Sequence, residues 1–433
     1  MKKTLLLSVV ASTMIMAGGD IAPVEPVVEA PAVVENTSAW EFNGQAVAYT
    51  QTVDSHGTKD LFSEDTTYAA LGLQLRAINK NLFAGFGVGL EVSAVQQSST
   101  LTNIPDTANN FAFPFIGGGD AQVSSATISQ AYFTYGIGNT MIKVGRQTLP
   151  KSLSPFAYSE GWQMFKNTME AALVVNTDLP DTTLVYAAVG RTNSSIGNLD
   201  NWDRMDLTKG NTVGIIHMLT AQNKSVSNLT LTGTYYYAPD MVGEGNDANI
   251  LWGDAKYKAS SFTFAVQGGQ ITADTLDDTT AFGAKVGAKL GMINASVAYS
   301  TVDGPLRITN LATIQHPSPG LGIKSPLYTQ QVLNNIGNHQ AQNSDWIKVA
   351  ASAKLLGGKI GVAYGQGMDN NSPEKGETGS AFGPNPYEFD LTYKTKLTEN
   401  TTFFAAYVLT NRDRQTVDED SNNFVRFWAR YNF

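Results

Sequence analysis

The final segment of the chain constrains the fold more than any other, because an apolar side chain occupies every second position. The apolar set is Val425, Phe427, Ala429, Tyr431 and Phe433, and the opposite set is Phe424, Arg426, Trp428, Arg430 and Asn432. Successive residues of a strand point to opposite faces. A strand with an apolar, aromatic-ended face and two arginines on the other is typical of a membrane barrel, whose outer face meets lipid and whose inner face meets water. The alternative interpretation is an edge strand of a soluble sheet.

The aromatic stripe of this segment ends on the last residue, Phe433. A terminal aromatic residue on such a strand resembles the signal that delivers bacterial outer-membrane proteins to the barrel assembly machinery. We therefore predict Phe433, Tyr431 and Phe427 as an assembly signal, with the assembly machinery as a partner.

The N-terminal region predicts export. Residues 1–19 match a secretory signal peptide: Lys2 and Lys3 are basic, and the apolar core that follows is too short to span a membrane. Residues 20–38 are rich in proline and glutamate and predict an extended periplasmic tail. This tail is interpreted as a spacer, with a contact to a periplasmic partner as the alternative. The barrel is predicted over 39–433.

Composition excludes several kinds of site. The chain has no cysteine, so neither disulfides nor thiolate metal sites are available. Its formal charge of -9 becomes -11 once Lys2 and Lys3 leave with the signal peptide. A protein this acidic lacks the basic face that nucleic-acid binding requires, so no nucleic acid is expected as a partner.

From residue 40 onward, alternating segments of roughly ten residues are joined by connections of alternating length. Short turns are predicted at 79–81, 136–139, 178–182, 259–261, 291–292, 357–358 and 397–400. Long loops are predicted at about 51–66, 97–123, 150–170, 192–212, 238–248, 271–279, 303–345, 368–386 and 411–422. Nine long extracellular loops and short periplasmic turns predict an all-β, transmembrane antiparallel barrel of eighteen strands. Sixteen strands is the alternative, because the pairs near 124–149, 171–191 and 213–237 are weakly marked.

A barrel of this width leaves an aqueous channel unless loops fold into it. By strand parity, the inner wall carries more basic than acidic side chains. The predicted pore-wall residues are Arg76, Lys285, Lys289, Lys348, Glu388, Asp390, Arg426 and Arg430. The same parity predicts that eight further charged side chains point inward: Lys143, Lys256, Lys354, Lys359, Lys394, Glu41, Glu91 and Asp254. A wall of one sign attracts counter-ions and repels co-ions. The alternative is that these lysines only keep the lumen wet.

Two loops are long and apolar enough to fold into the lumen: the third, at 150–170, and the seventh, at 303–345. Such apolar loops are expected to pack against something, either the lumen or a neighbouring subunit. The charged residues predicted at the resulting constriction are Arg146, Lys151, Glu160, Lys166, Glu170, Arg191, Arg307, Lys324 and Asp345.

One stretch resembles a known family. The residues I-K-V-G-R-Q-T-L-P at 142–150, the aromatic loop after them and N-T-D-L-P-D-T-T-L at 176–184 are similar to the porin D family and to the related major outer-membrane porins of epsilonproteobacteria. The resemblance implies an eighteen-strand barrel, often a homotrimer, narrowed by its third and seventh loops. The proline-rich tail is not part of the family's usual pattern. Ion and substrate preference do not carry over, because members differ in both.

Enzymatic and metal sites are weakly indicated. The four histidines, His56, His217, His316 and His339, show no spacing typical of a catalytic site. Asp418, Glu419 and Asp420 offer a loop site for calcium, although no EF-hand spacing is present and solvated loop charge is the simpler interpretation. No other cofactor is predicted.

Taken together, these patterns predict a non-enzymatic porin of the bacterial outer membrane. It would let small hydrophilic solutes and ions diffuse through a wet lumen filtered at loops three and seven, with lipid and lipopolysaccharide around it. A substrate-specific channel for small charged solutes, and a structural or adhesive barrel with a sealed pore, are the alternatives.

Overall fold

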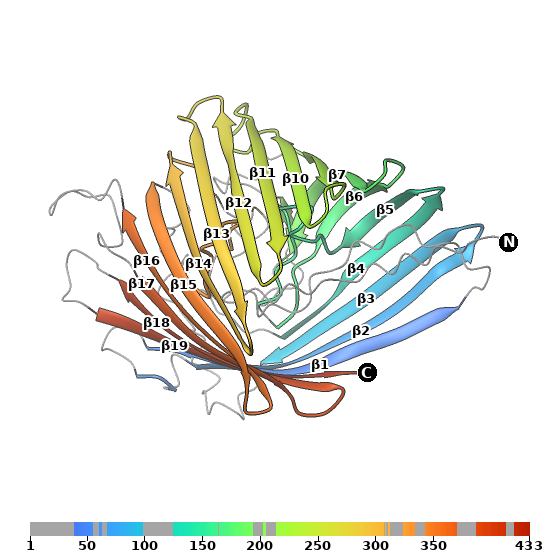
Figure 1. The fold of residues 1–433 in the computed structure, drawn as a ribbon. Coiled ribbons are helices and arrows are strands. Elements are labelled where there is room, and N and C mark those ends of the chain that lie inside the picture. The colour runs from blue at the N-terminus through green and yellow to red at the C-terminus, as the bar shows by residue number, and fades with distance from the viewer. Residues whose placement is uncertain are drawn as a thin grey trace.

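The computed structural model describes residues 39–54, 60–62, 67–97, 124–162, 164–193, 202–204, 214–306, 308, 311, 324–333, 343–369, 387–412 and 420–433. The predicted signal peptide and periplasmic tail lie outside these residues. Figure 1 shows the strands following one another in chain order around a single barrel.

The described chain is built from strands. They are β1 (Trp40–Val53), β2 (Thr67–Phe83), β3 (Phe86–Gln97), β4 (Ser124–Ile137), β5 (Thr140–Gln147), β6 (Met169–Asn176), β7 (Thr182–Asn193), β8 (Trp202–Arg204), β9 (Ile216–Asn223), β10 (Leu229–Ala238), β11 (Ala248–Ala259), β12 (Phe262–Ala273), β13 (Thr279–Leu290), β14 (Ile293–Asp303), β15 (Ser344–Leu355), β16 (Gly358–Asp369), β17 (Tyr387–Lys396), β18 (Thr401–Arg412) and β19 (Asp420–Asn432). Among these residues, no helix reaches the length and apolarity needed to cross a bilayer.

Eighteen of these strands close the barrel by antiparallel pairing of each with the next. The short β8 pairs only with the end of β7, while β7 continues to β9. The seam is made by β1 and β19, from the pair Gln45 and Asn432 to the pair Val53 and Phe424. The predicted count of eighteen is therefore confirmed, and the alternative of sixteen is wrong, since the three weakly marked strand pairs all form.

The first hairpin differs from the prediction. β2 runs through the residues predicted as a turn at 79–81 and ends at Phe83, so the turn is Ala84 and Gly85. Both turn residues have positive φ, 48° and 85°, as a two-residue hairpin of the primed type requires. The polar residues that suggested a turn form a register irregularity instead, in which Asn81 Oδ1 accepts a hydrogen bond from Gly85 N at 3.0 Å.

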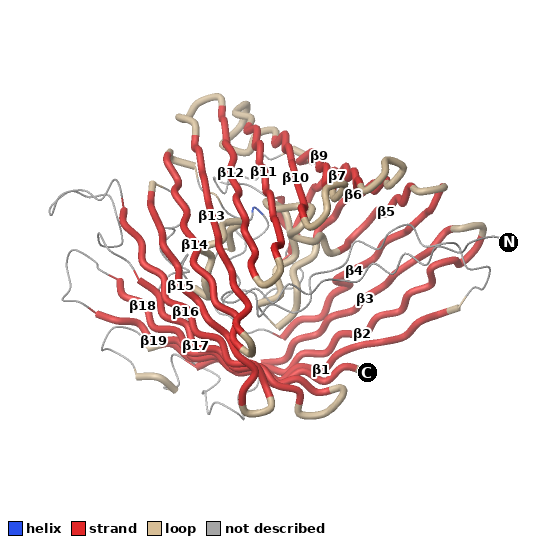
Figure 2. The backbone as a smooth tube through the Cα atoms, in the orientation of Figure 1, coloured by secondary structure: helices blue, strands red, loops and turns tan. Residues whose placement is uncertain are grey.

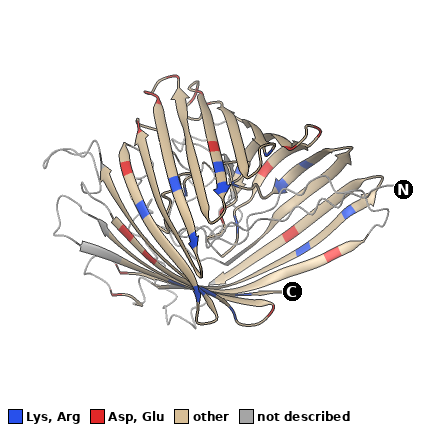
Figure 3. Ribbon diagram, viewed as in Figure 1, with Lys and Arg blue, Asp and Glu red and all other residues tan. Residues whose placement is uncertain are grey.

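The two faces of the barrel wall have different chemistry. Large apolar side chains such as Phe282, Val286 and Val349 are exposed on the outer face. Lys285 and Lys348 alternate with them on the inner face and are buried. Figure 3 shows how the charged residues are distributed along the strands. The outer face therefore suits lipid, and the inner face carries the polar groups.

Two apolar clusters lie inside the barrel. The first joins loop residues to the inner faces of strands between β6 and β14, and the second joins them to β1, β2, β3, β18 and β19. Figure 2 shows tan loop segments within the ring of strands, besides the tan turns at the ends of the strands. The interior is thus packed by loops that enter from the wall.

The seam offers a test of closure. Gly44 N donates to Phe433 O at 2.9 Å, and a Cβ on Gly44 would stand 2.7 Å from the Phe433 ring and 2.5 Å from the Gln74 carbonyl oxygen of β2. We expect Gly44→Val to displace this ring and lower the yield of folded barrel, measured as the fast-migrating unheated band in gel electrophoresis. Ala48→Val, on the exposed outer face of the same strand, is the matched control and should fold normally. Equal yields of the two variants would contradict the role of this contact.

Candidate channel lining between loop 3 and the barrel wall

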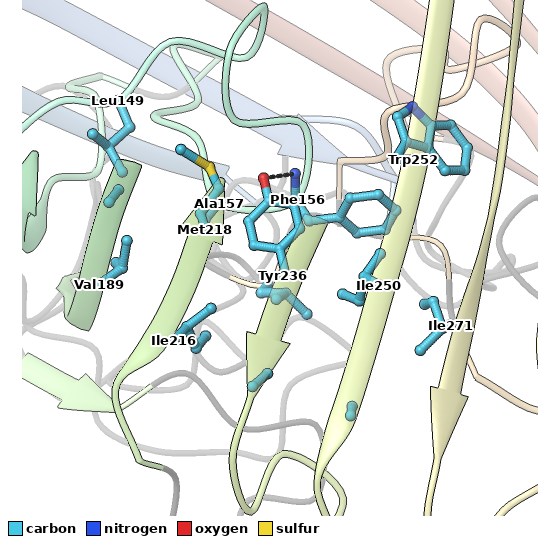
Figure 4. Close-up of a cluster of buried hydrophobic side chains, with 14 of the residues drawn as sticks. Leu149, Phe156, Ala157, Val189, Ile216, Met218, Tyr236, Ile250, Trp252 and Ile271 are labelled. Atoms are coloured by element: carbon cyan, nitrogen blue, oxygen red, sulfur yellow. Dashed lines mark hydrogen bonds between the residues drawn. The ribbon is translucent and has the colours of Figure 1, made fainter. Parts of the chain in front are cut away.

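Loop 3, defined here as residues 148–168, crosses the lumen, and its first half packs on one side of the wall. Phe156 is fully buried, with its ring edge-on to Tyr236 at 5.9 Å and to Trp252 at 5.3 Å between centroids. Its backbone N–H donates to the Tyr236 hydroxyl at 3.1 Å (Figure 4). Leu149 and Leu153 join the same cluster. The first half of loop 3 is therefore stabilised in the same way as the core of a domain: its apolar side chains are buried and its backbone polar groups are hydrogen-bonded.

The second half of loop 3 packs on the β18, β19 and β1 side. The Trp162 ring lies edge-on to Phe404 at 5.3 Å. The Arg426 guanidinium, fully buried, donates to the Trp162 carbonyl at 2.7 Å and to Gln51 Oε1 at 2.9 Å. Arg430 donates to the carbonyl of Met164 at 3.0 Å. The two arginines of the final strand therefore anchor loop 3 to the wall.

The described part of loop 7 packs beside loop 3. Lys151 Nζ donates to the Ser325 carbonyl at 2.8 Å, and Leu311 N donates to the Phe156 carbonyl at 2.8 Å. On its other side, Leu333 N donates to a Glu388 carboxylate oxygen at 2.6 Å. The two loops thus form one packed unit across the lumen.

A buried pair of opposite charges lies where the loops meet. Burial raises the pKa of the Glu160 carboxyl and lowers the pKa of the Lys324 ammonium, and each charge opposes the shift of the other. Glu160 accepts from Trp162 N at 2.5 Å, and Lys324 donates to the carbonyls of Gln331 and Val332 at 3.2 and 2.8 Å. These hydrogen bonds lie within each loop, and the Lys324 ammonium joins the two loops by lying 5.2 Å from the centroid of the Trp162 ring.

A cavity of about 330 Å³ remains between loop 3 and the wall of β1 to β6 and β19. Its lining is Gln45, Gln74, Arg76, Ile78, Asn79, Lys80, Val88, Glu91, Gln130, Tyr132, Thr134, Met141, Lys143, Gln147, Thr148, Pro150, Lys166, Thr168, Leu173 and Arg430. Five of these side chains are basic and one is acidic. The cavity is therefore electropositive within an acidic protein.

Ion pairing reduces this surplus, since Lys80 Nζ lies 3.2 Å from Glu41 Oε1 outside the lining. The one acidic lining residue, Glu91, is paired with Arg76, whose Nε donates at 3.0 Å, and also accepts from Ser129 at 2.7 Å. Lys143 Nζ lies 3.7 Å from the centroid of the Tyr132 ring, a cation–π contact that leaves its charge in place. The apolar lining, such as Ile78 and Leu173, gives the cavity a mixed character.

The structure divides the predicted constriction residues into three groups. Lys151, Glu160, Lys166 and Lys324 lie in the lumen on loops 3 and 7, and of these only Lys166 lines the cavity. Arg307 lies outside the described residues. The others, Arg146, Glu170, Arg191 and Asp345, lie on the outer face of the barrel.

The prediction that Arg146, Glu170, Arg191 and Asp345 lie at the constriction is wrong. Arg146 and Glu170 are paired at 3.1 Å on the face opposite to Gln147 and Met169, which point inward and are fully buried. Arg191 is exposed next to the buried, inward Thr192, and Asp345 accepts from the outward Tyr299 hydroxyl at 2.7 Å. The four were chosen for their nearness to loops in sequence. A shift of one residue along a strand reverses the face.

The predicted wall residues all share the inward parity, but their surroundings differ. Arg76 and Arg430 line the cavity, Lys285 is buried, and Lys289 is exposed near the β13 turn. The prediction that the remaining four line an open lumen is wrong, because loops 3 and 7 cover them: Lys348, Glu388, Asp390 and Arg426. Lys348, for example, donates to the Gln330 carbonyl at 2.7 Å.

Sequence reasoning did not select Lys80 or Tyr132 for the lining. Lys80 was assigned to the turn that the structure moves to Ala84 and Gly85. Tyr132 lies in β4, where a bulge opposite Glu91 and Val92 interrupts the alternation. Inward parity in the half of β4 that follows the bulge would have found it.

Metal binding finds no support in the described ranges, where no three His, Asp or Glu residues group as ligands. Of the acidic residues predicted for calcium, Asp418 and Glu419 lie outside those ranges, and Asp420 opens β19. The calcium site stays a prediction.

No protein-family model matches the sequence, and no curated protein matches it either. Crystal structures of Pseudomonas aeruginosa porins do match. OccK8 (OprE) has a TM-score of 0.67 at 12% identity, covering 91% of this chain and 98% of that chain. OccK2 (OpdF) in complex with glucuronate has a TM-score of 0.67 at 10% identity, with the same coverage. OccD3 (OpdP) has a TM-score of 0.65 at 12% identity, covering 94% and 93%.

At these identities the likeness concerns the fold, which is that of an outer-membrane porin barrel. Together with the apolar outer face, it indicates the bacterial outer membrane, as predicted. Membership of the porin D family, and of its epsilonproteobacterial branch, stays a prediction.

The contact between the two loops can be tested at Lys324. Lys324→Met keeps the length of the side chain but leaves two buried carbonyls without their donor, which costs about 1–3 kcal/mol for each. We expect looser loops, seen as larger and noisier single-channel conductance in a planar bilayer. Lys289→Met removes an exposed lysine at the periplasmic end and should leave the conductance unchanged. An unchanged Lys324→Met channel would contradict this role for the pair.

Proposed function

We propose that this protein is an outer-membrane channel for small anionic organic solutes, which pass through the cavity between loop 3 and β1 to β6. The observation that carries the proposal is the lining of that cavity, where Lys143, Lys166 and Arg430 add positive charge beyond Arg76 and Lys80, which are ion-paired with Glu91 and Glu41. Like charges along a narrow path concentrate counter-ions and repel co-ions.

Each part of the cavity has a role in this mechanism. Lys166 on the loop and Lys143 on the wall supply opposing positive charges that draw an anion past loop 3. Ile78, Leu173 and the ring of Tyr132 supply apolar surface for the carbon skeleton of the solute. Several separate charges, rather than one deep site, favour entry without trapping the solute.

The packed lumen favours a selective channel over general diffusion. Loops 3 and 7 pack on the inner faces of β6 to β14 and of β18 round to β3, and loop 7 also bonds to β15 and β17, so a wide open pore does not match the geometry. The structural neighbour OccK2 was crystallised with glucuronate, a sugar acid, which agrees with an organic anion as the solute. A passive, non-enzymatic role fits the porin fold, as do lipid, lipopolysaccharide and the assembly machinery as partners.

Charge reversal at Lys166 tests the proposal. The wild-type channel should be anion-selective, as judged by the reversal potential in a KCl gradient. Lys166→Glu changes the local charge by two units, which acting about 8 Å away through water alters anion occupancy about five-fold. We therefore expect the reversal potential to move toward cation preference.

The matched control is Lys289→Glu, which makes the same charge change at an exposed inward position outside the cavity. It should shift the reversal potential much less. A cation-selective wild type, or equal shifts in the two variants, would refute the proposed path. A folded barrel without conductance would instead support the sealed, structural alternative.

A further inference from the structure

Three inward lysines stand side by side where β15, β16 and β17 approach their short turns. Lys359 is the register partner of Lys354 on one side and of Lys394 on the other. Lys354 is exposed, and the other two are half-buried. Like charges directly opposite each other on neighbouring strands are unfavourable, so such a surface favours a negatively charged partner. We call Lys354, Lys359 and Lys394 the lysine row.

The inward acidic side chains whose surroundings the structure describes are bonded elsewhere. Glu41, Glu91 and Asp254 are paired with Lys80, Arg76 and Lys256. Glu388 and Asp390 share β17 with the lysine row, but they accept from backbone N–H groups of loop 7 at 2.6 and 3.3 Å. An acidic partner for the lysine row therefore comes most readily from outside the wall.

The lysine row adjoins the cavity beside loop 3. Lys394 Nζ lies 5.9 Å from the centroid of the Trp428 ring, and the guanidinium carbon of Arg430 lies 4.9 Å from the centroid of the same ring. Arg430 in turn lines the cavity. A chain segment bound at the lysine row would therefore stand beside the path proposed for anions.

The predicted periplasmic tail at 20–38 has the charge that this row requires. It carries Asp20, Glu25, Glu29 and Glu35 and contains no lysine or arginine. Its three prolines predict an extended chain that rises about 3.1 Å per residue. The tail precedes Trp40, the first residue of β1, which pairs with Asn79 near the short turn of β2 and β3. It therefore meets the barrel on the side where the lysine row lies.

The tail is also long enough to reach the row. From β1, pairing runs through β19, β18, β17 and β16 to β15. A strand spacing of about 4.8 Å and a tilt of about 40° set neighbours about 6 Å apart along the rim, so β17 and β15 lie about 19 and 31 Å from β1. Glu35 and Glu29 precede Trp40 by 5 and 11 residues, which is about 16 and 34 Å of extended chain. These two glutamates therefore match Lys394 and Lys354.

We infer that the acidic tail binds the lysine row of its own barrel at the periplasmic mouth. Single exposed ion pairs are weak, but a short tether holds the glutamates at an effective concentration of about 1 mM, and several pairs form together. Salt should release the tail, because the Debye length falls from about 30 Å at 0.01 M to about 3 Å at 1 M. One consequence rests on the proposed function: the bound tail competes with anionic solutes beside the cavity.

Pairs of spin labels test the contact directly, because the chain has no cysteine of its own. One label is placed in the tail at Val28→Cys, next to Glu29, and the other at the exposed Leu355→Cys, next to Lys354. In the mature protein in lipid nanodiscs at about 0.01 M KCl, we expect a short and narrow distribution of distances between the labels. At about 1 M KCl the distribution should lengthen and broaden.

The matched control moves the second label to Ile137→Cys, an equally exposed residue at the turn end of β4. β4 lies three strands from β1 in one direction, whereas β15 lies five strands away in the other. A tail without a binding site would therefore lie nearer to 137 than to 355. A shorter distance to 355 reports binding at the lysine row rather than the length of the tether.

A second variant removes the charge of the tail and leaves the barrel unchanged. With Glu25→Gln, Glu29→Gln and Glu35→Gln together, we expect the short distance to 355 to be lost at low salt. Val24→Gln with Val34→Gln adds amides without removing charge and should keep it. If the proposed path also holds, the charge variant should increase anion conductance at low salt and leave it unchanged at high salt.

Three results would overturn the inference. A tail nearer to 137 than to 355 at low salt would show that the lysine row does not bind it. A short distance that survives high salt or the three glutamine substitutions would assign the contact to apolar packing. A short distance between chains that carry one label each would show that the row binds the tail of a neighbouring copy. The distances are measured without ion flow, so failure of the proposed path leaves this test intact.

Discussion

The structure depends first on the need to pair every backbone N–H and C=O within hydrocarbon, where no water can take their place. Pairing of β1 with β19 meets this need, since it removes the two free edges that an open sheet would leave in the lipid. Closure also fixes an inside and an outside for each residue. Strand parity then decides whether a side chain meets lipid or the lumen, and the seam contact between Gly44 and Phe433 is where the ring is completed.

Closing eighteen strands creates an interior too wide for wall side chains to fill. Loops 3 and 7 fill much of this interior and pack against the wall as the side chains of a domain core pack. Phe156 is buried against Tyr236 and Trp252 on one side, and Trp162 against Phe404 on the other. The wall near β1 to β5 is polar instead, with Gln74, Glu91 and Lys143 pointing inward. Loop 3 packs on Val47, Ala70 and Val95 at one part of β1 to β3 and leaves the electropositive cavity beside the polar part.

Buried charges give this loop packing a single arrangement. Arg426 and Lys348, which an open pore would expose to water, donate to loop carbonyls, and Glu160 faces Lys324 between the loops. Separating any of these groups would leave a buried charge or carbonyl unsatisfied, which strongly opposes rearrangement.

The amino-acid sequence by itself determined the barrel, because alternation with a period of two and the alternation of short and long connections are local properties. It also determined inward parity for most wall residues, and it singled out loops 3 and 7 by their apolar content. Only the tertiary structure decided which inward residues meet water: Arg76 and Lys143 line the cavity, whereas Lys348 and Arg426 lie under loops. It also placed Arg146, Glu170 and Arg191 outside. The reason is physical, since burial depends on contacts between residues distant in the chain, and a shift of one residue at a strand end reverses its face.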